Sequence, residues 1–160
     1  MNPNPKQLSP SELDTVRSDV AKRINAMPKV SKDEKDRLIE KVHTAKTLEL
    51  LRVVHFERGK ANLPKNLSDE LISSIHGSDM ESKLSDPTTV LVVAGYADSG
   101  GDQQLNFRLS NERAESVAKL LRQQGNILNV IHTVAMGATD LLDSKRPDQN
   151  RAVEIWAVTP

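Results

Sequence analysis

Apolar residues recur at helical spacing in the first part of the chain. Between residues 9 and 28 they lie three or four positions apart, which predicts an amphipathic helix. The apolar positions are Leu13, Val16, Val20, Ile24 and Met27. Ser9, Pro10 and Glu12 have the identities and spacing of a capped helix start, and Pro28 ends the pattern.

A second helical stripe follows directly. Ser31 and Glu34 form a capping box at its start. The apolar positions behind the box are Leu38, Ile39, Val42 and Ala45. Two amphipathic helices cannot bury both stripes alone, so we expect them to pack on the rest of the chain or on another subunit. Residues 1–46 are therefore interpreted as a helical tether or linker and as a candidate surface for forming a homodimer.

After residue 50 the pattern alternates between strand and helix. Strands are predicted at 51–56, 88–94, 130–136 and 152–158. Helices are predicted at 67–75, around 80–84, and after a cap at Ser110, with Gly125 beyond the end of the last one. The run at 88–94 is almost continuously apolar, which is typical of a central strand covered on both faces. The order βαβαββ predicts an α/β two-layer sandwich with a mixed sheet over residues 47–160.

Composition and charge exclude several classes of protein. The chain has 160 residues, with 22 Lys plus Arg, 22 Asp plus Glu, four His and no Cys. Zero net charge argues against a nucleic-acid binder and against a polybasic membrane-surface protein. Without Cys there is no thiol nucleophile, no redox dithiol and no Cys-ligated zinc. Only four aromatic residues are present, too few for a base-stacking or sugar-stacking platform.

The chain shows no sign of a membrane segment of its own. Its longest apolar run, around residues 90–95, is too short to span a bilayer. Residues 1–6 lack the apolar core of a secretory signal. We therefore expect any signal or membrane anchor to lie outside this chain.

Residues 95–114 leave the carboxyl end of the predicted central strand and enter a helix. In open α/β sheets, ligands usually bind at this point. The glycines Gly95, Gly100 and Gly101 allow sharp turns and close approach of a ligand. Arg113, three residues after a predicted Ser110 cap, is disfavoured by the helix dipole. Arg113 is therefore expected either to form a salt bridge, with Asp98 or Glu57, or to bind an anionic ligand.

The same segment resembles a known family. The string Asn106-x-x-Leu109-Ser110-x-x-Arg113-Ala114-x-x-Val117-x-x-x-Leu121, preceded by Gly95-x-x-Asp98-x-x-Gly101, is similar to the OmpA-like peptidoglycan-binding domain. Residues 54–63 and 150–155 resemble the opening and closing strands of that domain. The resemblance covers residues 48–158. It implies a domain in the periplasm or cell envelope of Gram-negative type that anchors an envelope protein to the cell wall.

The resemblance also implies a ligand, the diaminopimelate residue of the peptidoglycan stem peptide. By position, Asp98 matches the aspartate that receives the ligand's ammonium, and Arg113 matches the arginine that binds its carboxylate. A guanidinium fork suits bidentate hydrogen bonding to a carboxylate. A helix start at Ser110 would add backbone N–H donors for the anionic group.

Further positions match site residues of the family, and some of them hold a different residue type. Asn106 matches an asparagine that shapes the loop and can contact the ligand, and Arg151 matches an arginine near the site. Ala97 stands where the family usually has Thr. The Thr hydroxyl is therefore missing, and only the backbone N–H of Ala97 could donate to a ligand. Glu57 stands where Asp is common, and Ala152 replaces a second cation.

Other chemistries fit the sequence less well. The glycine loop lacks the Lys of a P-loop, and Asp98 and Asp102 would repel phosphate. The four histidines are scattered, and no catalytic motif is present. Asp140, Asp143 and Asp148 do not have EF-hand spacing, so residues 140–148 are interpreted as a solvated loop. We predict no enzyme activity, no metal and no cofactor.

One alternative of a different functional class stays open. An OmpA-type fold can serve as an interaction or dimerisation module of an envelope or motor assembly, without appreciable affinity for peptidoglycan. Exposed apolar stripes on the first two helices would favour this interpretation.

Overall fold

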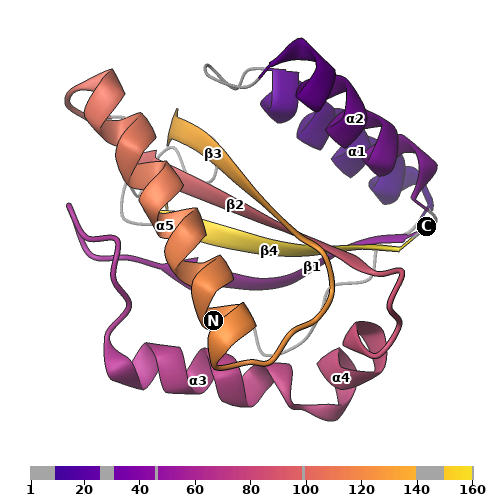
Figure 1. The fold of residues 1–160 in the computed structure, drawn as a ribbon. Coiled ribbons are helices and arrows are strands. Elements are labelled where there is room, and N and C mark those ends of the chain that lie inside the picture. The colour runs from indigo at the N-terminus through magenta and orange to yellow at the C-terminus, as the bar shows by residue number, and fades with distance from the viewer. Residues whose placement is uncertain (1–9, 26–30, 46, 99, 140–149, 160) are drawn as a thin grey trace.

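The computed structural model describes residues 10–25, 31–45, 47–98, 100–139 and 150–159 (Figure 1). The elements follow the order α1 (Pro10–Asn25), α2 (Lys32–Thr44), β1 (Thr47–His55), α3 (Lys65–Ile75), α4 (Ser78–Leu84), β2 (Val90–Asp98), α5 (Gln103–Gln123), β3 (Ile131–Thr139) and β4 (Ala152–Thr159). Every strand and helix predicted from the hydrophobic pattern is present, with shifted bounds.

The strands form one mixed sheet in the order β1-β4-β2-β3. Strand β4 is antiparallel to both β1 and β2, whereas β2 and β3 are parallel. This confirms the predicted βαβαββ arrangement. Strand β2 lies between two neighbours and is covered on both faces, as its continuous apolar run predicted.

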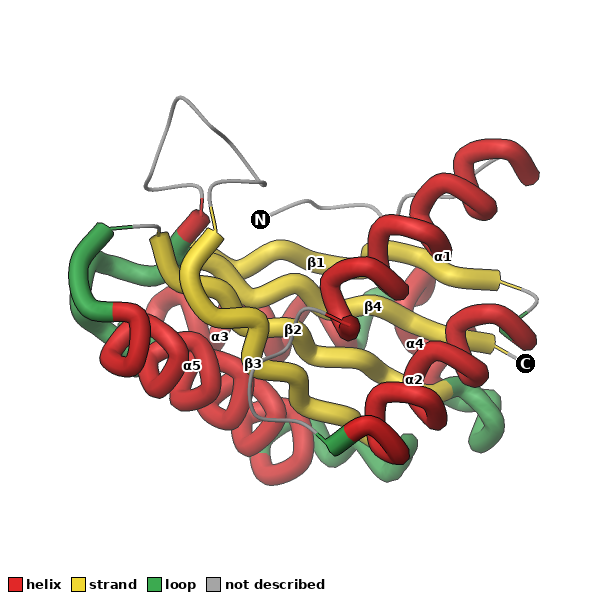
Figure 2. The backbone as a smooth tube through the Cα atoms, turned by 90° about the horizontal axis from the view of Figure 1, so that it is seen from above, coloured by secondary structure: helices red, strands yellow, loops and turns green. Residues whose placement is uncertain are grey.

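Helices cover both faces of the sheet (Figure 2). On one face, α3, α4 and α5 enclose the main core, which includes Leu51, Leu71, Val93, Val117, Leu121, Val153 and Ile155. On the other face lie α1 and α2 (Figure 1). The contact of these two helices with the sheet forms a second core, which includes Ile24, Leu38, Val42, Leu48, Ala94, Tyr96 and Val134. The first two helices therefore pack on the rest of their own chain, and their role as a tether stays a prediction.

The three predicted helix starts have different outcomes. The Ser31 side chain accepts a hydrogen bond of 3.2 Å from the Glu34 backbone N–H, which confirms Ser31 as the N-cap of α2. The first cap, Ser9, lies outside the described residues. The predicted cap at Ser110 is wrong, because α5 begins seven residues earlier at Gln103. There the Asp102 side chain accepts a hydrogen bond of 3.0 Å from the Leu105 backbone N–H.

Gly95 brings α5 against the sheet. A Cβ atom at this position would lie 2.0 Å from the Ser110 carbonyl oxygen and 3.0 Å from the Ala114 Cβ atom. The expectation that Gly95 allows close approach of a ligand is therefore wrong, because the helix backbone fills this space. The close packing fixes α5 over β2, so that residues on the inner side of the helix reach the end of that strand.

Candidate ligand-binding site

Arg113 lies in the middle of α5 and is completely buried, with 0% of its surface exposed. Its Nε atom donates to the Lys60 carbonyl at 2.8 Å, and its Nη1 and Nη2 atoms donate to the Tyr96 and Glu57 carbonyls at 3.0 and 3.2 Å. The guanidinium carbon also lies 5.4 Å from the centre of the Phe56 ring. Arg113 therefore joins α5 to β2 and to the loop after β1.

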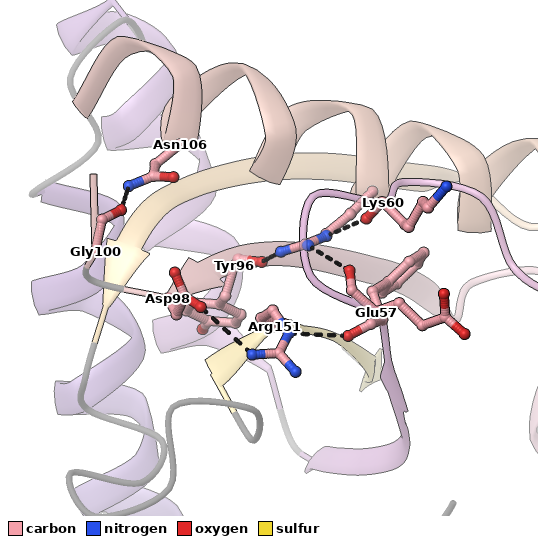
Figure 3. A network of polar contacts seen from close by, with 9 residues as sticks. Glu57, Lys60, Tyr96, Asp98, Gly100, Asn106 and Arg151 are labelled. Carbon is pink, nitrogen blue, oxygen red and sulfur yellow. Dashed lines mark hydrogen bonds and ion pairs between the residues drawn. The ribbon is translucent and has the colours of Figure 1, made fainter. Parts of the chain in front are cut away.

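The loop after β1 is shaped for this contact. The Lys60 N–H donates to the Glu57 carbonyl at 3.0 Å, and Gly59 adopts a positive φ of 71° that few other residues tolerate. The turn brings the carbonyls of Glu57 and Lys60 to one guanidinium, as Figure 3 shows together with the Tyr96 carbonyl. The local backbone, rather than a carboxylate, therefore holds this cation.

Burial changes the acid–base behaviour of Arg113. Loss of water and, to a smaller extent, the positive charge of Arg151 lower the pKa of its guanidinium to about 10, whereas Asp98 opposes the change. Even so, the group remains a cation at neutral pH. The predicted salt bridges of Arg113 with Asp98 or Glu57 are not among the ion pairs of the described residues. Arg113 contacts Glu57 through the backbone carbonyl instead.

Asp98 forms its ion pair with Arg151. The Arg151 Nη1 atom lies 3.4 Å from the Asp98 Oδ2 atom, and the Arg151 Nε atom donates to the Phe56 carbonyl at 3.2 Å (Figure 3). The two side chains meet because Asp98 ends β2 and Arg151 precedes β4, which runs antiparallel to β2. About a fifth of each side chain reaches solvent, 23% for Asp98 and 19% for Arg151. This pair is the accessible part of the site.

Asn106 closes the loop between β2 and α5. Its side chain is buried, and its Nδ2 group donates a hydrogen bond to the Gly100 carbonyl (Figure 3). The next residue, Gly101, has a positive φ of 83°. The arrangement agrees with the loop-shaping role expected of Asn106, and a contact with a ligand stays a prediction.

The other expected site residues lie in different surroundings. Ser110 is buried, and its hydroxyl donates to the Phe107 carbonyl at 2.7 Å and accepts from the Gly137 N–H at 2.9 Å. Its expected role at a helix N-terminus is therefore wrong. The Ala97 side chain is buried. Glu57 is exposed, and its carboxylate points away from Asp98 (Figure 3).

Sequence reasoning missed Lys60 and Tyr96 as partners of Arg113, and it expected the carboxylate of Glu57 rather than its carbonyl. Lys60, Tyr96 and Glu57 all contribute carbonyl oxygens, which every residue type has, so no side-chain pattern identifies them. The only local signal is the Gly59 turn, which aligns two of the three carbonyls.

The described residues contain neither a metal-binding cluster nor a membrane-spanning helix. In the part of the chain that the structure describes, no group of three or more His, Asp or Glu residues could hold a metal ion. The aspartates at 140, 143 and 148 lie outside the described residues. None of the described helices is both long and apolar enough to cross a membrane.

A family model described as the OmpA family matches residues 55–154. The chain is 42% identical over 73 residues to the probable lipoprotein YiaD of Escherichia coli strain K12, which is 43% of this chain and 33% of that protein. It is 32% identical over 130 residues to outer membrane protein A of Klebsiella aerogenes, with 70% and 35% of the two chains covered. Outer membrane protein P5 of Haemophilus influenzae is 33% identical over 105 residues, with 66% and 28% covered. The chain thus spans about a third of the length of these relatives.

Solved structures share the fold. The peptidoglycan-associated lipoprotein from Burkholderia pseudomallei matches with a TM-score of 0.55 and 20% identity, over 66% of this chain and 89% of that one. The periplasmic domain of MotB matches with a TM-score of 0.55 and 18% identity, over 83% and 86% of the two chains. The OmpA-like domain of FopA1 from Francisella tularensis matches with a TM-score of 0.53 and 24% identity, over 71% and 73%. At these identities the likeness concerns the fold alone.

Proposed function

The chain belongs to the OmpA family, and from that premise we propose that it binds peptidoglycan non-covalently and so anchors an envelope protein to the cell wall. The observation that carries the proposal is the partly exposed Asp98–Arg151 pair at one end of the sheet, with the Arg113 cation behind it. Opposite charges at an accessible edge suit a ligand that itself carries both charges.

We propose the diaminopimelate residue of the stem peptide as that ligand. Its free amino-acid end has an ammonium and a carboxylate on one carbon. Asp98 would accept hydrogen bonds from the ammonium, and a guanidinium would donate to the carboxylate, both as charge-assisted hydrogen bonds. Asn106 supports this role by holding the loop next to Asp98 in one shape.

The relatives support a place in the cell envelope. Their names describe outer membrane proteins, a probable lipoprotein and a peptidoglycan-associated lipoprotein. We therefore propose that the chain is a periplasmic domain of an envelope protein.

The role proposed is binding, not catalysis. An acid/base pair of Asp98 and Glu57 would need both carboxylates to face one substrate. The Glu57 carboxylate instead points away from Asp98 (Figure 3). This orientation supports a non-enzymatic function for the site.

Sedimentation with insoluble peptidoglycan tests the proposal. The wild-type chain should sediment with the sacculi, and Asp98→Asn should remain largely in the supernatant. Asp69→Asn is the matched control, because Asp69 is an exposed aspartate that forms its own ion pair with Lys65 on α3. Equal sedimentation of all three proteins, or of none, would contradict the proposal.

The alternative of an interaction module without appreciable peptidoglycan affinity also rests on one observation. Arg113, the cation that the family resemblance assigns to the ligand, is completely buried and donates to three backbone carbonyls. A wild-type chain that stays in the supernatant would favour this alternative.

A further inference from the structure

The second core, between the sheet and the helices α1 and α2, is not completely filled. A narrow cavity of about 40 Å³ remains between the two helices and the sheet. Apart from Lys41 and His132, the side chains that line it are apolar or aromatic. This volume exceeds the roughly 10–15 Å³ that one water molecule needs, and a cavity with so little polar lining stays dry and accepts apolar groups.

The cavity reaches the surface of the molecule. Four of the apolar side chains that line it are only half-buried, although two helices cover this face of the sheet: Val90, Val92, Met136 and Trp156. They lie on the adjacent strands β4, β2 and β3, and Val92 is the direct neighbour of Trp156 across two of these strands. An alkyl chain that enters the cavity can therefore continue along these side chains.

The two polar residues of the lining meet at the rim. The Lys41 Nζ atom lies 2.7 Å from the His132 Nε2 atom, and the Lys41 side chain is exposed. The ammonium is the donor in this contact, so the ring nitrogen accepts. Burial and, after it, the Lys41 charge lower the pKa of His132, while Glu34 opposes them. The ring is therefore neutral at neutral pH, and Lys41 supplies the positive charge of the pair.

Lys41 has no carboxylate partner among the ion pairs of the described residues. Its side-chain hydrogen bond goes to the His132 ring instead, and Glu34 on the same helix forms no ion pair with it. A cation with a neutral partner thus lies at the mouth of an apolar cavity. This arrangement is complementary to a ligand with an anionic head and an apolar tail.

We propose that the cavity binds a fatty acid, with the carboxylate at Lys41 and the first part of the alkyl chain between α2 and the sheet. The carboxylate accepts a charge-assisted hydrogen bond from the ammonium. The chain removes apolar surface of Val92 and Trp156 from water. The site lies on the face of the sheet opposite α5 (Figure 2), so it does not depend on the proposed binding of peptidoglycan.

Fluorescence of Trp156 tests the proposal, because this residue is the only tryptophan of the chain and lines the cavity. Decanoate, used below the concentration at which it forms micelles, should change the emission in a saturable way. From hexanoate to decanoate the affinity should rise by up to about fourfold for each methylene group buried. Decyltrimethylammonium has the same chain and the opposite charge, and it should bind at least about tenfold more weakly.

Two exposed lysines of α2 provide a matched pair of variants. Lys41→Gln removes the ammonium from the rim and should bind decanoate roughly tenfold less tightly. Lys32→Gln is the control, because Lys32 does not line the cavity, and it should keep the wild-type affinity. Ala94→Val fills part of the cavity from β2 and should also weaken the binding of decanoate.

Three results would overturn the proposal. They are an emission that decanoate leaves unchanged, equal affinities of the wild-type chain and Lys41→Gln for decanoate, and binding of decyltrimethylammonium as tight as that of decanoate. Binding to vesicles of anionic phospholipid without binding to monomeric decanoate would overturn it too, because the ligand would then lie on the outer surface and not in the cavity.

Discussion

The Nη1 group of Arg113 donates a hydrogen bond of 3.0 Å to the carbonyl of Tyr96, two residues before Asp98. A buried cation on the helix therefore fixes the strand end from which the accessible carboxylate projects. Arg113 therefore holds this part of the site through backbone carbonyls rather than through a salt bridge with Asp98 or Glu57.

The first prediction concerns the stability that Arg113 provides. Arg113→Lys keeps the charge but cannot reach three diverging carbonyls, so buried acceptors lose their donors. We expect the free energy of unfolding to fall by about 3 kcal/mol, measured by urea denaturation. Arg122→Lys, at an exposed position of the same helix, should cost less than about 1 kcal/mol. Equal losses in the two variants would contradict a structural role for Arg113.

The second prediction concerns Asp98, which should matter little for stability. Its ion pair with Arg151 is long and partly exposed. Asp98→Asn should therefore change the free energy of unfolding by about 1 kcal/mol or less. Circular dichroism during thermal unfolding provides the measurement. A loss as large as that of Arg113→Lys would mean that Asp98 is part of the folding core rather than a binding group.

The third prediction concerns Gly95 and the packing of α5. In Gly95→Ala the new Cβ atom would lie 2.0 Å from the Ser110 carbonyl oxygen, so the helix must move away from β2. We expect a loss of about 3 kcal/mol in the free energy of unfolding. Gly59→Ala is the comparison, because nothing lies within 4 Å of its Cβ position and only the positive φ opposes it. That variant should cost about 1 kcal/mol, and a larger cost than for Gly95→Ala would contradict the packing argument.

Hydrophobic periodicity was sufficient to predict the order of the elements, because the fold buries one stripe or face of each element. The start of α5 was predicted wrongly for a local reason. Both Asp102 and Ser110 are residue types that cap helices, and residues 103–109 contain no Gly or Pro that would decide between them. In the structure Asp102 caps the helix, and the Ser110 hydroxyl bonds within it instead.

The candidate site was predicted in part. Asp98, Asn106 and Arg151 lie at one end of the sheet, as the resemblance implied. The burial of Arg113 could not be predicted, because its partners are backbone carbonyls, two of them brought together by a turn 53 to 56 residues earlier in the chain. Periodicity places Arg113 among the inward positions of α5, but it does not tell a ligand-binding cation from a structural one.

The fourth prediction concerns pH and the contact between α2 and the sheet. The Lys41 Nζ atom lies 2.7 Å from the His132 Nε2 atom, so a neutral His132 accepts its hydrogen bond. Burial and the Lys41 charge lower the pKa of His132, while Glu34 opposes them. The folded chain therefore binds this proton less readily than the unfolded chain does.

The sign of the pH effect follows from this difference. As the pH falls through the ordinary histidine pKa of about 6.5 toward the lower value of the folded state, the unfolded chain takes up more protons and the folded state loses stability. Urea midpoints at about pH 7.5 and about pH 5.5 should show this loss, and His132→Gln should reduce it. His43→Gln, at an exposed position of α2, is the control. An unchanged pH dependence in His132→Gln would contradict the prediction.

The last prediction concerns α1 and α2 as part of the fold rather than a separate tether. Their buried side chains Ile24, Leu38 and Val42 pack against one face of the sheet. Removal of residues 1–46 should expose that face, and exposed apolar patches of this kind favour self-association. Light scattering should then show dimers or larger species, and the urea midpoint should fall relative to the full chain. The ligand site lies at the end of β2, where α5 and the loop after β1 hold it, so peptide binding should persist in the truncated protein. A truncated protein that is monomeric and as stable as the full chain would show instead that the two helices are a detachable appendage, as the sequence alone suggested.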